Sequence, residues 1–369
     1  MYNCIRSMKK ILIVFNHPAP YKVRLFNELS KNFDLHVIFE RGSASDRNKG
    51  FYFEEDFNFT THKIHGIKFG REGLLSFGVK KHLKHNKYDL VVMNGYSHFA
   101  EMCAISYLKK KKIPYVLYIN GGTVKKESPL KQKLKRHFIQ GAYAYFSPDE
   151  QSNKYLEYYG ADRTKILNFP YSTIYEKEIV KSKPNKEQIR QELGINFDKV
   201  FVSAGQLIKR KNYLSLVKEW QKSPGNHGLF LIGDGKQRKE IETFIKENGL
   251  NNVVLTGFLN REKMFKYFQA ADVFLFPSKE DIYGHVINEA MSQGIPVIST
   301  NKVNSAIKLV KDGTNGYLLE NLVGDEFRNA IEKLLNKDCF DVCVSSAKEN
   351  TIEKMSAVHV KMINEVLSK

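Results

Sequence analysis

The stretch that most constrains the fold of this chain runs from Pro277 to Thr300. The apolar run Phe274–Phe276 in front of it is typical of a buried strand. A helix is expected to begin near Gly284, because apolar residues then recur at helical spacing, namely Val286, Ile287, Ala290 and Met291. Gly294 followed by Pro296 is a stop signal for that helix. The stretch therefore predicts a strand, a polar loop, a helix and a second strand.

Two carboxylates lie close to the predicted turn from loop to helix, Asp281 before it and Glu289 inside the helix. The free N–H groups at the start of a helix form a site for anions. A carboxylate about one and a half turns further along can accept hydrogen bonds from the vicinal hydroxyls of a ribose. The combination predicts a site for a nucleotide diphosphate.

These residues also carry a resemblance to a known family. Asp281, Tyr283, Gly284 and Glu289 form an acid–aromatic–glycine–acid pattern with the two acids eight positions apart. The pattern resembles the donor-site signature of the GT-B glycosyltransferases of the retaining family 4, in which the first acid is usually Glu. The resemblance implies that Asp281 orients the donor sugar and that Glu289 binds the ribose. It also implies that the backbone amides of Gly284 and His285 contact the diphosphate.

A basic loop that begins with glycine follows the predicted strand Lys199–Ala204. The family pattern here is Gly-Arg-Leu and then Lys-Gly. The sequence matches it at Gly205 and Lys211, with Gln206 where Arg is usual. The resemblance implies that Lys211 binds the diphosphate, where a fixed cation stabilises the charge that grows on the departing oxygen. Arg210 either reaches the phosphates as well or faces solvent.

Two later turns of the second half complete the predicted donor site. Gly233 follows the apolar run Leu229–Ile232 and is expected to permit a close backbone approach. The resemblance implies that the loop at Gly257 and Phe258 borders the nucleotide base.

The first half alternates short apolar runs with helix-like segments, which predicts a parallel sheet covered by helices. The expected strands are Ile11–Phe15, Leu35–Phe39, Leu90–Met93, Tyr115–Ile119 and Ala142–Phe146. Two loops follow strands at the carboxyl edge, where such sheets bind ligands. Asn16 and His17 lie in the first loop and Asn120 and Gly121 in the second. These four residues are the candidates for acceptor binding, and the alternative is that both loops are plain turns.

The length of 369 residues suits two domains. A polar stretch near residues 168–186 places the expected hinge, which gives domains of residues 1–175 and 176–350 and a final segment, 351–369. The resemblance implies an α/β GT-B fold, in which two Rossmann-like domains face each other across a cleft and the last helix crosses back to the first domain. Residues 1–7 are expected to be an extension outside the fold.

The net charge of +18 is concentrated in the first half, where residues 1–175 carry 29 Lys and Arg against 15 Asp and Glu. This imbalance predicts an anionic partner for the N-terminal domain. Lys125–Arg136 is a basic amphipathic segment with Leu130 and Leu134 at helical spacing. It is expected to lie on an anionic bilayer, and the alternative is a solvated helix face. No recognisable motif for nucleic-acid binding is present.

Other features of the sequence exclude some classes of protein. No apolar run approaches the roughly 18 residues of a membrane span. The four cysteines show no metal or redox spacing, which favours a reducing cytosol. No aspartate is followed two residues later by another, so the usual metal-binding pair of the other main glycosyltransferase fold is absent, and neither a metal nor a cofactor is expected.

The resemblance thus implies a retaining glycosyltransferase that uses a nucleotide-diphosphate sugar, with Asp281, Glu289 and Lys211 as the catalytic residues. The basic first half suggests a lipid-linked saccharide acceptor at the inner face of the cell membrane, in capsule, exopolysaccharide or O-antigen assembly. We therefore expect a cytoplasmic protein that binds the membrane peripherally. The alternatives are a sugar-nucleotide epimerase of GT-B shape and a non-catalytic basic binding module.

Overall fold

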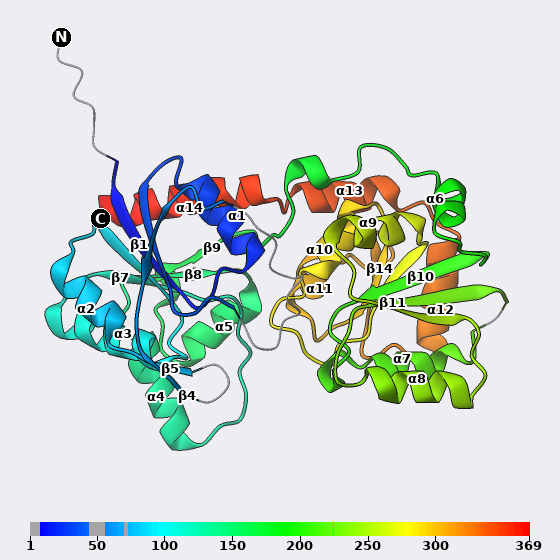
Figure 1. Ribbon diagram of the computed structural model, residues 1–369, viewed down its shortest axis with the longest axis horizontal. Coiled ribbons are helices and arrows are strands. Elements are labelled where there is room, and N and C mark those ends of the chain that lie inside the picture. The colour runs from blue at the N-terminus through cyan, green and yellow to red at the C-terminus, as the bar shows by residue number, and fades with distance from the viewer. Residues whose placement is uncertain (1–7, 44–55, 70–72, 224) are drawn as a thin grey trace, which may run out of the picture. The chain divides into compact units, whose positions relative to one another are not determined.

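The computed structural model describes residues 8–43, 56–69, 73–223 and 225–369. The expectation for residues 1–7 lies outside these ranges. The chain divides into two compact units. The first unit comprises the chain up to Tyr171 together with Ile352–Lys369, and the second comprises Ser172–Thr351. The last helix, α14 (Ile352–Ser368), therefore belongs with the first unit (Figure 1).

The first unit is built on a seven-stranded sheet in which all pairings are parallel. The strand order is β3-β2-β1-β6-β7-β8-β9, so the direction of winding reverses between β1 and β6. The strands are β1 (Lys10–Phe15), β2 (Asp34–Phe39), β3 (Thr60–Lys63), β6 (Leu90–Asn94), β7 (Tyr115–Tyr118), β8 (Ala144–Ser147) and β9 (Ile166–Asn168). An antiparallel pair, β4 (Ile67–Phe69) and β5 (Gly73–Leu75), lies apart from this sheet.

Helices cover both faces of this sheet. Alternate side chains of β1 point to opposite faces, and they are buried on both. Leu12 and Val14 belong to a core with α2 (Gly78–His85) and α3 (Phe99–Lys111). Ile13 and Phe15 face α1 (Pro20–Leu29) and α14, which pack against each other (Figure 1). Helices α4 (Pro129–Ile139) and α5 (Glu150–Tyr158) complete the unit.

The second unit contains a six-stranded parallel sheet of order β12-β11-β10-β13-β14-β15. This is the doubly wound order of a Rossmann domain, with its topological switch point between β10 and β13. The strands are β10 (Lys199–Ala204), β11 (His227–Ile232), β12 (Val253–Gly257), β13 (Val273–Phe276), β14 (Val297–Thr300) and β15 (Gly316–Leu319).

The first helix of the second unit precedes β10, and the other helices follow the strands. They are α6 (Lys186–Glu192), α7 (Tyr213–Trp220), α8 (Arg238–Glu247), α9 (Arg261–Ala270), α10 (Val286–Ser292), α11 (Asn304–Leu309), α12 (Gly324–Leu335) and α13 (Phe340–Lys348). Val273–Phe276 and Val297–Thr300 are buried throughout, as strands covered on both faces must be. The predicted α/β class with two parallel sheets is confirmed.

Candidate functional site

The switch point of the second unit brings a lysine and an aspartate together. Lys211 closes a short helical turn, Lys209–Lys211, after β10, and Asp281 lies in the loop after β13. Because neighbouring parallel strands end at the same edge, both loops reach that edge. The ammonium of Lys211 forms an ion pair with the carboxylate of Asp281, and both side chains are largely buried. The structure therefore joins two of the three predicted catalytic residues.

The electrostatics of the pair favour the charged form of the Asp281 carboxyl. Burial alone would raise the pKa of Asp281, but the ammonium of Lys211, its hydrogen bond and the nearby charge of Arg210 hold that pKa below 3.8. Lys211 Nζ also lies 4.3 Å from the centroid of the Phe276 ring, a geometry that favours a cation. The site thus contains a fixed positive charge next to a fixed negative one.

Arg210 lies beside this pair but is more exposed. Its Nη1 is 3.6 Å from Asp281 Oδ1 and donates to the carbonyl oxygen of Glu280 at 3.0 Å. Its side chain is 41% exposed. Arg210 is therefore exposed enough to reach an anion at the edge, whereas Gln206 is half-buried in the preceding loop.

Glu289 lies in the first turn of α10 and forms a separate group of contacts. Its Oε1 accepts hydrogen bonds from Thr173 Oγ1 at 2.7 Å and from Arg261 Nη1 at 2.8 Å. Arg261 Nε also donates to Glu178 Oε1 at 2.8 Å. Arg261, Thr173 and Glu178 were not predicted from the sequence, since these residues lie far from the motif along the chain. The one local signal is that Arg261 is the first residue of α9, after the N-cap residue Asn260.

Hydrogen bonds and close packing hold the turn at Gly284 against the start of α11. Gly284 has a φ of +90°, and a Cβ there would lie 2.7 Å from Val303 Cγ1 and 2.9 Å from Ser305 Oγ. Ser305 binds this turn twice, through its N–H to the carbonyl of Tyr283 at 2.8 Å and through its hydroxyl to the carbonyl of Gly284 at 2.7 Å. Helix α10 begins at Val286, two residues later than expected, because the backbone at Gly284 is left-handed. His285 occupies the N-cap position.

The other glycines of the predicted donor site, Gly205, Gly233 and Gly257, allow the backbones of three loops to come into contact. A Cβ on Gly233 would lie 2.0 Å from the carbonyl oxygen of Gly205, and Gly233 has a φ of +141°. The N–H of Gly233 donates to the carbonyl of Gly257 at 2.8 Å. These glycines are thus needed for contact between loops whether or not a ligand is bound. Phe258, next to Gly257, is 40% exposed.

The acceptor candidates lie at the carboxyl edge of the first sheet. Asn16 follows β1, and its Oδ1 accepts from the N–H of His17 at 2.9 Å, a geometry of a local turn. Asn120 follows β7 and is hydrogen-bonded on both sides of its amide, to Asn94 at 2.7 Å and to Tyr171 at 2.8 Å. Gly121 next to it has a φ of +147°. The two hydrogen bonds thus hold the side chain of Asn120 in one orientation.

No group of three metal-binding side chains occurs within the described ranges. No helix in this part of the chain is both long enough and apolar enough for a membrane crossing.

Comparisons with known proteins agree with this architecture. Residues 185–353 match the family model described as glycosyl transferases group 1, and residues 10–147 match the model described as glycosyl transferase 4-like. An uncharacterized glycosyltransferase of Methanocaldococcus jannaschii is 28% identical over 202 residues, which is 53% of this chain and 51% of that protein. The match therefore spans about half the length of that relative.

Two further similarities concern a named enzyme and a solved structure. The N-acetylgalactosamine-N,N'-diacetylbacillosaminyl-diphospho-undecaprenol 4-alpha-N-acetylgalactosaminyltransferase of Campylobacter jejuni is 30% identical over 124 residues, 33% of each chain. The crystal structure of HepE from Anabaena in complex with UDP superimposes with a TM-score of 0.77. It is 18% identical and covers 96% of this chain and 100% of its own. At that identity the structure shows a shared fold.

Proposed function

Because the chain belongs to the GT-B glycosyltransferases of family 4, we propose that it moves a sugar from a nucleotide-diphosphate donor to a lipid-linked glycan acceptor, with retention of configuration. The observation that carries this proposal is the ion pair between Lys211 and Asp281 at the switch point of the second unit. A buried cation there can meet a diphosphate, and the neighbouring carboxylate can accept hydrogen bonds from sugar hydroxyls.

When the donor binds, the two members of the ion pair would contact different parts of it, Lys211 the diphosphate and Asp281 the sugar. In the free protein the charge of Lys211 is balanced by Asp281. A diphosphate that approaches Lys211 offers more negative charge and leaves Asp281 available to the sugar. Arg210 and the backbone amides of Gly284 and His285 would add further contacts. These cationic and polar groups suit a diphosphate without a metal, and the proposal includes no metal or cofactor.

The transfer step itself needs little covalent chemistry from the protein. The bond from the anomeric carbon to the diphosphate oxygen breaks, and a bond to the acceptor oxygen forms on the same face. The acceptor proton passes to the departing phosphate. Lys211 would stabilise the charge that grows on that phosphate, so that fixed positions matter more than a protein base.

Glu289 is the proposed partner of the ribose hydroxyls. Arg261 and Thr173 hold its carboxylate in place through contacts of 2.8 and 2.7 Å. Arg261 occupies one side of the carboxylate oxygen Oε1, so a diol would approach the rest of the group. Gly205, Gln206, Gly233, Gly257, Phe258 and Tyr283 complete the proposed surroundings of the donor.

The acceptor is proposed to bind the first unit at Asn16, His17, Asn120 and Gly121. The name of the relative from Campylobacter jejuni includes a saccharide linked to diphospho-undecaprenol. A similar acceptor would keep this chain at the inner, cytoplasmic face of the membrane, with the basic helix α4 on anionic lipid. The proposed pathway is the assembly of a capsule, an exopolysaccharide or an O-antigen.

The test begins with a screen of UDP-, GDP- and ADP-sugars for an increase in melting temperature, since ligands that bind the native state raise it. With the best donor, Lys211→Ala and Glu289→Ala should abolish transfer to lipid-linked saccharides while circular dichroism stays native. Lys209→Ala, an exposed lysine of the same short turn, is the matched control and should remain active. Full transfer by both site variants would overturn the proposal, and conversion of the donor without an acceptor would indicate an epimerase.

A further inference from the structure

Lys22 is completely buried in the first unit, although lysine side chains usually keep their ammonium in water. Its Nζ donates to the hydroxyl of Tyr118 at 2.7 Å. The same atom lies 4.2 Å from the centroid of the Tyr118 ring and 4.6 Å from that of Tyr171. Phe15 and Tyr21 lie at 5.2 and 5.6 Å. Lys22 thus forms no ion pair within the described part of the chain but is surrounded by four aromatic rings.

This arrangement is costly unless the contacts compensate for the lost water. Burial lowers the pKa of Lys22 well below its ordinary value of 10.5. The faces of aromatic rings attract a cation, and the hydroxyl of Tyr118 satisfies the amine in either protonation state. The contacts that stabilise the buried amine of Lys22 therefore also hold the surrounding rings in place.

The rings held by Lys22 come from the carboxyl edge of the first sheet and from the end of the unit. Phe15 ends β1. Tyr118 ends β7. Tyr171 is the last residue of the unit before the chain enters the second one. One amine therefore fixes three segments that are far apart in sequence.

A short chain of hydrogen bonds leads from these rings to an acceptor candidate. The hydroxyl of Tyr171 donates to Asn120 Oδ1 at 2.8 Å, and Asn120 Nδ2 donates to Asn94 Oδ1 at 2.7 Å. Asn94 ends β6, the strand between β1 and β7. The orientation of the Asn120 amide therefore depends on the position of the Tyr171 ring, which Lys22 holds.

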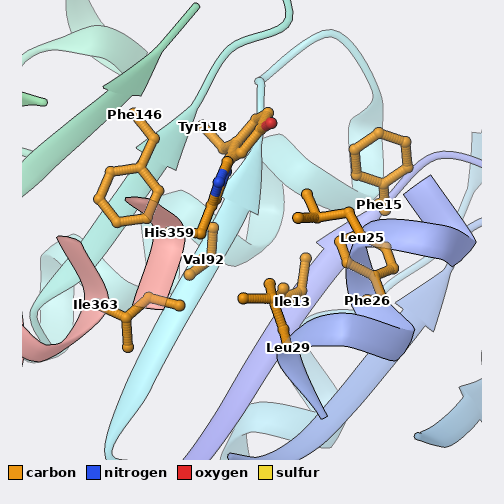
Figure 2. A pocket seen from close by; sticks show the side chains of 10 residues that line it. All are labelled: Ile13, Phe15, Leu25, Phe26, Leu29, Val92, Tyr118, Phe146, His359 and Ile363. Atoms are coloured by element: carbon orange, nitrogen blue, oxygen red, sulfur yellow. The ribbon is translucent and has the colours of Figure 1, made fainter. Parts of the chain in front are cut away.

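A small cavity lies next to two of the four rings. Phe15 and Tyr118 also line a small apolar cavity, together with His359 and Ile363 of α14 (Figure 2). A ring next to a cavity can move into it when its contacts on the other side are lost. Without the amine, Phe15 and Tyr118 can shift toward this cavity.

We propose that Lys22 is a positioning residue for the acceptor side of sugar transfer: by holding Tyr118 and Tyr171, it fixes the amide of Asn120 where the acceptor binds. This inference rests on the proposed function. Lys22 acts only within the first unit, so its loss reduces the rate of transfer and leaves donor binding to the second unit unchanged.

The experiment first follows the side-chain amide of Asn120 directly. In protein labelled with ¹⁵N-asparagine, the two Nδ2 proton signals are assigned by their loss in Asn120→Asp. Lys22→Met keeps the aliphatic stem but removes the amine, and Tyr171→Phe removes the hydroxyl that binds Asn120. Both variants should shift the same pair of signals. Lys109→Met is the control, because Lys109 binds backbone carbonyls of the same unit away from this edge.

The second readout is transfer from the sugar nucleotide that gives the largest thermal shift. Lys22→Met and Tyr171→Phe should each lower the rate at least tenfold, and the double variant should be no slower than either, since both act through one contact. The thermal shift given by that sugar nucleotide should match the native protein in all variants. Lys109→Met should be fully active.

The inference would be overturned if the Asn120 signals of Lys22→Met stayed native. It would also be overturned if Lys22→Met shifted these signals and Tyr171→Phe did not. If Lys22→Met does not fold, Tyr118→Phe, which removes only the hydroxyl bound to Lys22, takes its place with the same expected shift. The asparagine signals need no ligand. A protein that binds none of the sugar nucleotides but shows the expected shifts would therefore reject the proposed function while retaining the link from Lys22 to Asn120.

Discussion

Arg261 Nη1 lies 2.8 Å from Glu289 Oε1, in an ion pair whose side chains are 21% and 12% exposed. Arg261 also binds Glu178 at 2.8 Å, so one guanidinium pairs with two poorly solvated carboxylates. Removing one partner of a buried pair leaves an uncompensated charge, which costs roughly 3 kcal/mol. We therefore expect Arg261→Met to lower the free energy of unfolding by about that amount, measured by urea denaturation.

Arg163→Met is the control for this prediction, because Arg163 pairs with Glu150 and Glu157 at the exposed surface. Such surface pairs contribute less than about 1 kcal/mol. Equal losses of stability in Arg261→Met and Arg163→Met would contradict the role of Arg261. Donor binding should also weaken in Arg261→Met, since Glu289 loses the group that orients it.

The ion pair between Lys211 and Asp281 should behave differently when one or both charges are removed. Lys211→Met leaves the Asp281 carboxylate buried next to an apolar side chain, so the variant should lose about 3 kcal/mol of stability. The double variant Lys211→Met/Asp281→Asn removes both charges and should recover most of that loss. Both variants should be inactive, because the cation for the diphosphate is missing. Urea denaturation and a transfer assay separate the two effects.

The pH dependence of this pair is fixed by the lowered pKa of Asp281. A carboxyl whose pKa is lowered on folding stabilises the native state above its ordinary value of 3.8 and loses this contribution as pH falls through the folded value. The stability difference between the native protein and the double variant Lys211→Met/Asp281→Asn, which has no carboxyl at this position, should therefore be constant from pH 5 to 8. A difference that changes across this range would contradict a charged Asp281.

Gly233 tests whether the glycines of the donor loops are structural. A Cβ on Gly233 would lie 2.0 Å from a backbone oxygen, and the φ of +141° is strained for any other residue. Gly233→Ala should therefore cost more than about 3 kcal/mol and alter the neighbouring loops. Gly249→Ala is the matched control: Gly249 has a φ of +61° and no atom within 4 Å of the added Cβ. It should lose only about 1 kcal/mol. Similar melting temperatures would reject the steric argument.

Much of the architecture could be predicted from the sequence, because strands buried on both faces give continuous apolar runs. The same patterns placed Lys211, Asp281 and Glu289 after strands and therefore at one edge of a sheet. The start of α10 was less predictable, since the left-handed turn at Gly284 delays the helix to Val286. That conformation depends on packing against α11, which local sequence does not encode.

The partners of the site residues could not be predicted in the same way. Arg261 and Thr173 are 88 positions apart, yet the guanidinium of Arg261 reaches the carbonyl of Thr173 at 3.2 Å. No spacing pattern links such residues, because the fold alone brings them together. Lys22 shows the same limit: a cation at the start of a helix is usually exposed, whereas tertiary packing buries this one completely.

His359 of α14 should make the native state sensitive to acid. Burial lowers the pKa of His359 to about 3, although a hydrogen bond with the carbonyl of Met355 opposes the shift. The unfolded chain, with an ordinary value of 6.5, binds the proton first, so stability is complete above pH 6.5 and falls as pH decreases toward 3. At pH 5 the loss should be about 2 kcal/mol. Urea denaturation at pH 7.5 and 5 measures it.

His359→Phe keeps an aromatic ring but cannot bind a proton, so it should reduce the loss at pH 5 by that amount. The remaining histidines titrate equally in native protein and variant, which makes the difference between the two specific to His359. An unchanged acid dependence in His359→Phe would show that the ring is not buried as a neutral group.

The proposed membrane surface is helix α4, on which Leu130 and Leu134 are 79% and 48% exposed. They are four residues apart and therefore share a face of the helix. Glu127 precedes α4 and pairs with Lys131 and Lys135 of that helix. Lys133 and Arg136 remain exposed. Apolar side chains among cations suit an anionic bilayer, which takes up the leucines and attracts the charges. The protein should therefore sediment with vesicles that contain phosphatidylglycerol, and less so as salt rises.

The double variant Leu130→Ser/Leu134→Ser should weaken this binding at least tenfold, because two leucines no longer transfer from water into the bilayer. Val342→Ser is the control, since Val342 is also exposed, at 38%, but lies in α13 of the other unit. Its binding should equal that of the native protein. Neutral phosphatidylcholine vesicles should bind all three proteins weakly, because the cations find no partner there. If the double variant sediments as well as the control, the leucines do not enter the bilayer and α4 is a solvated helix face.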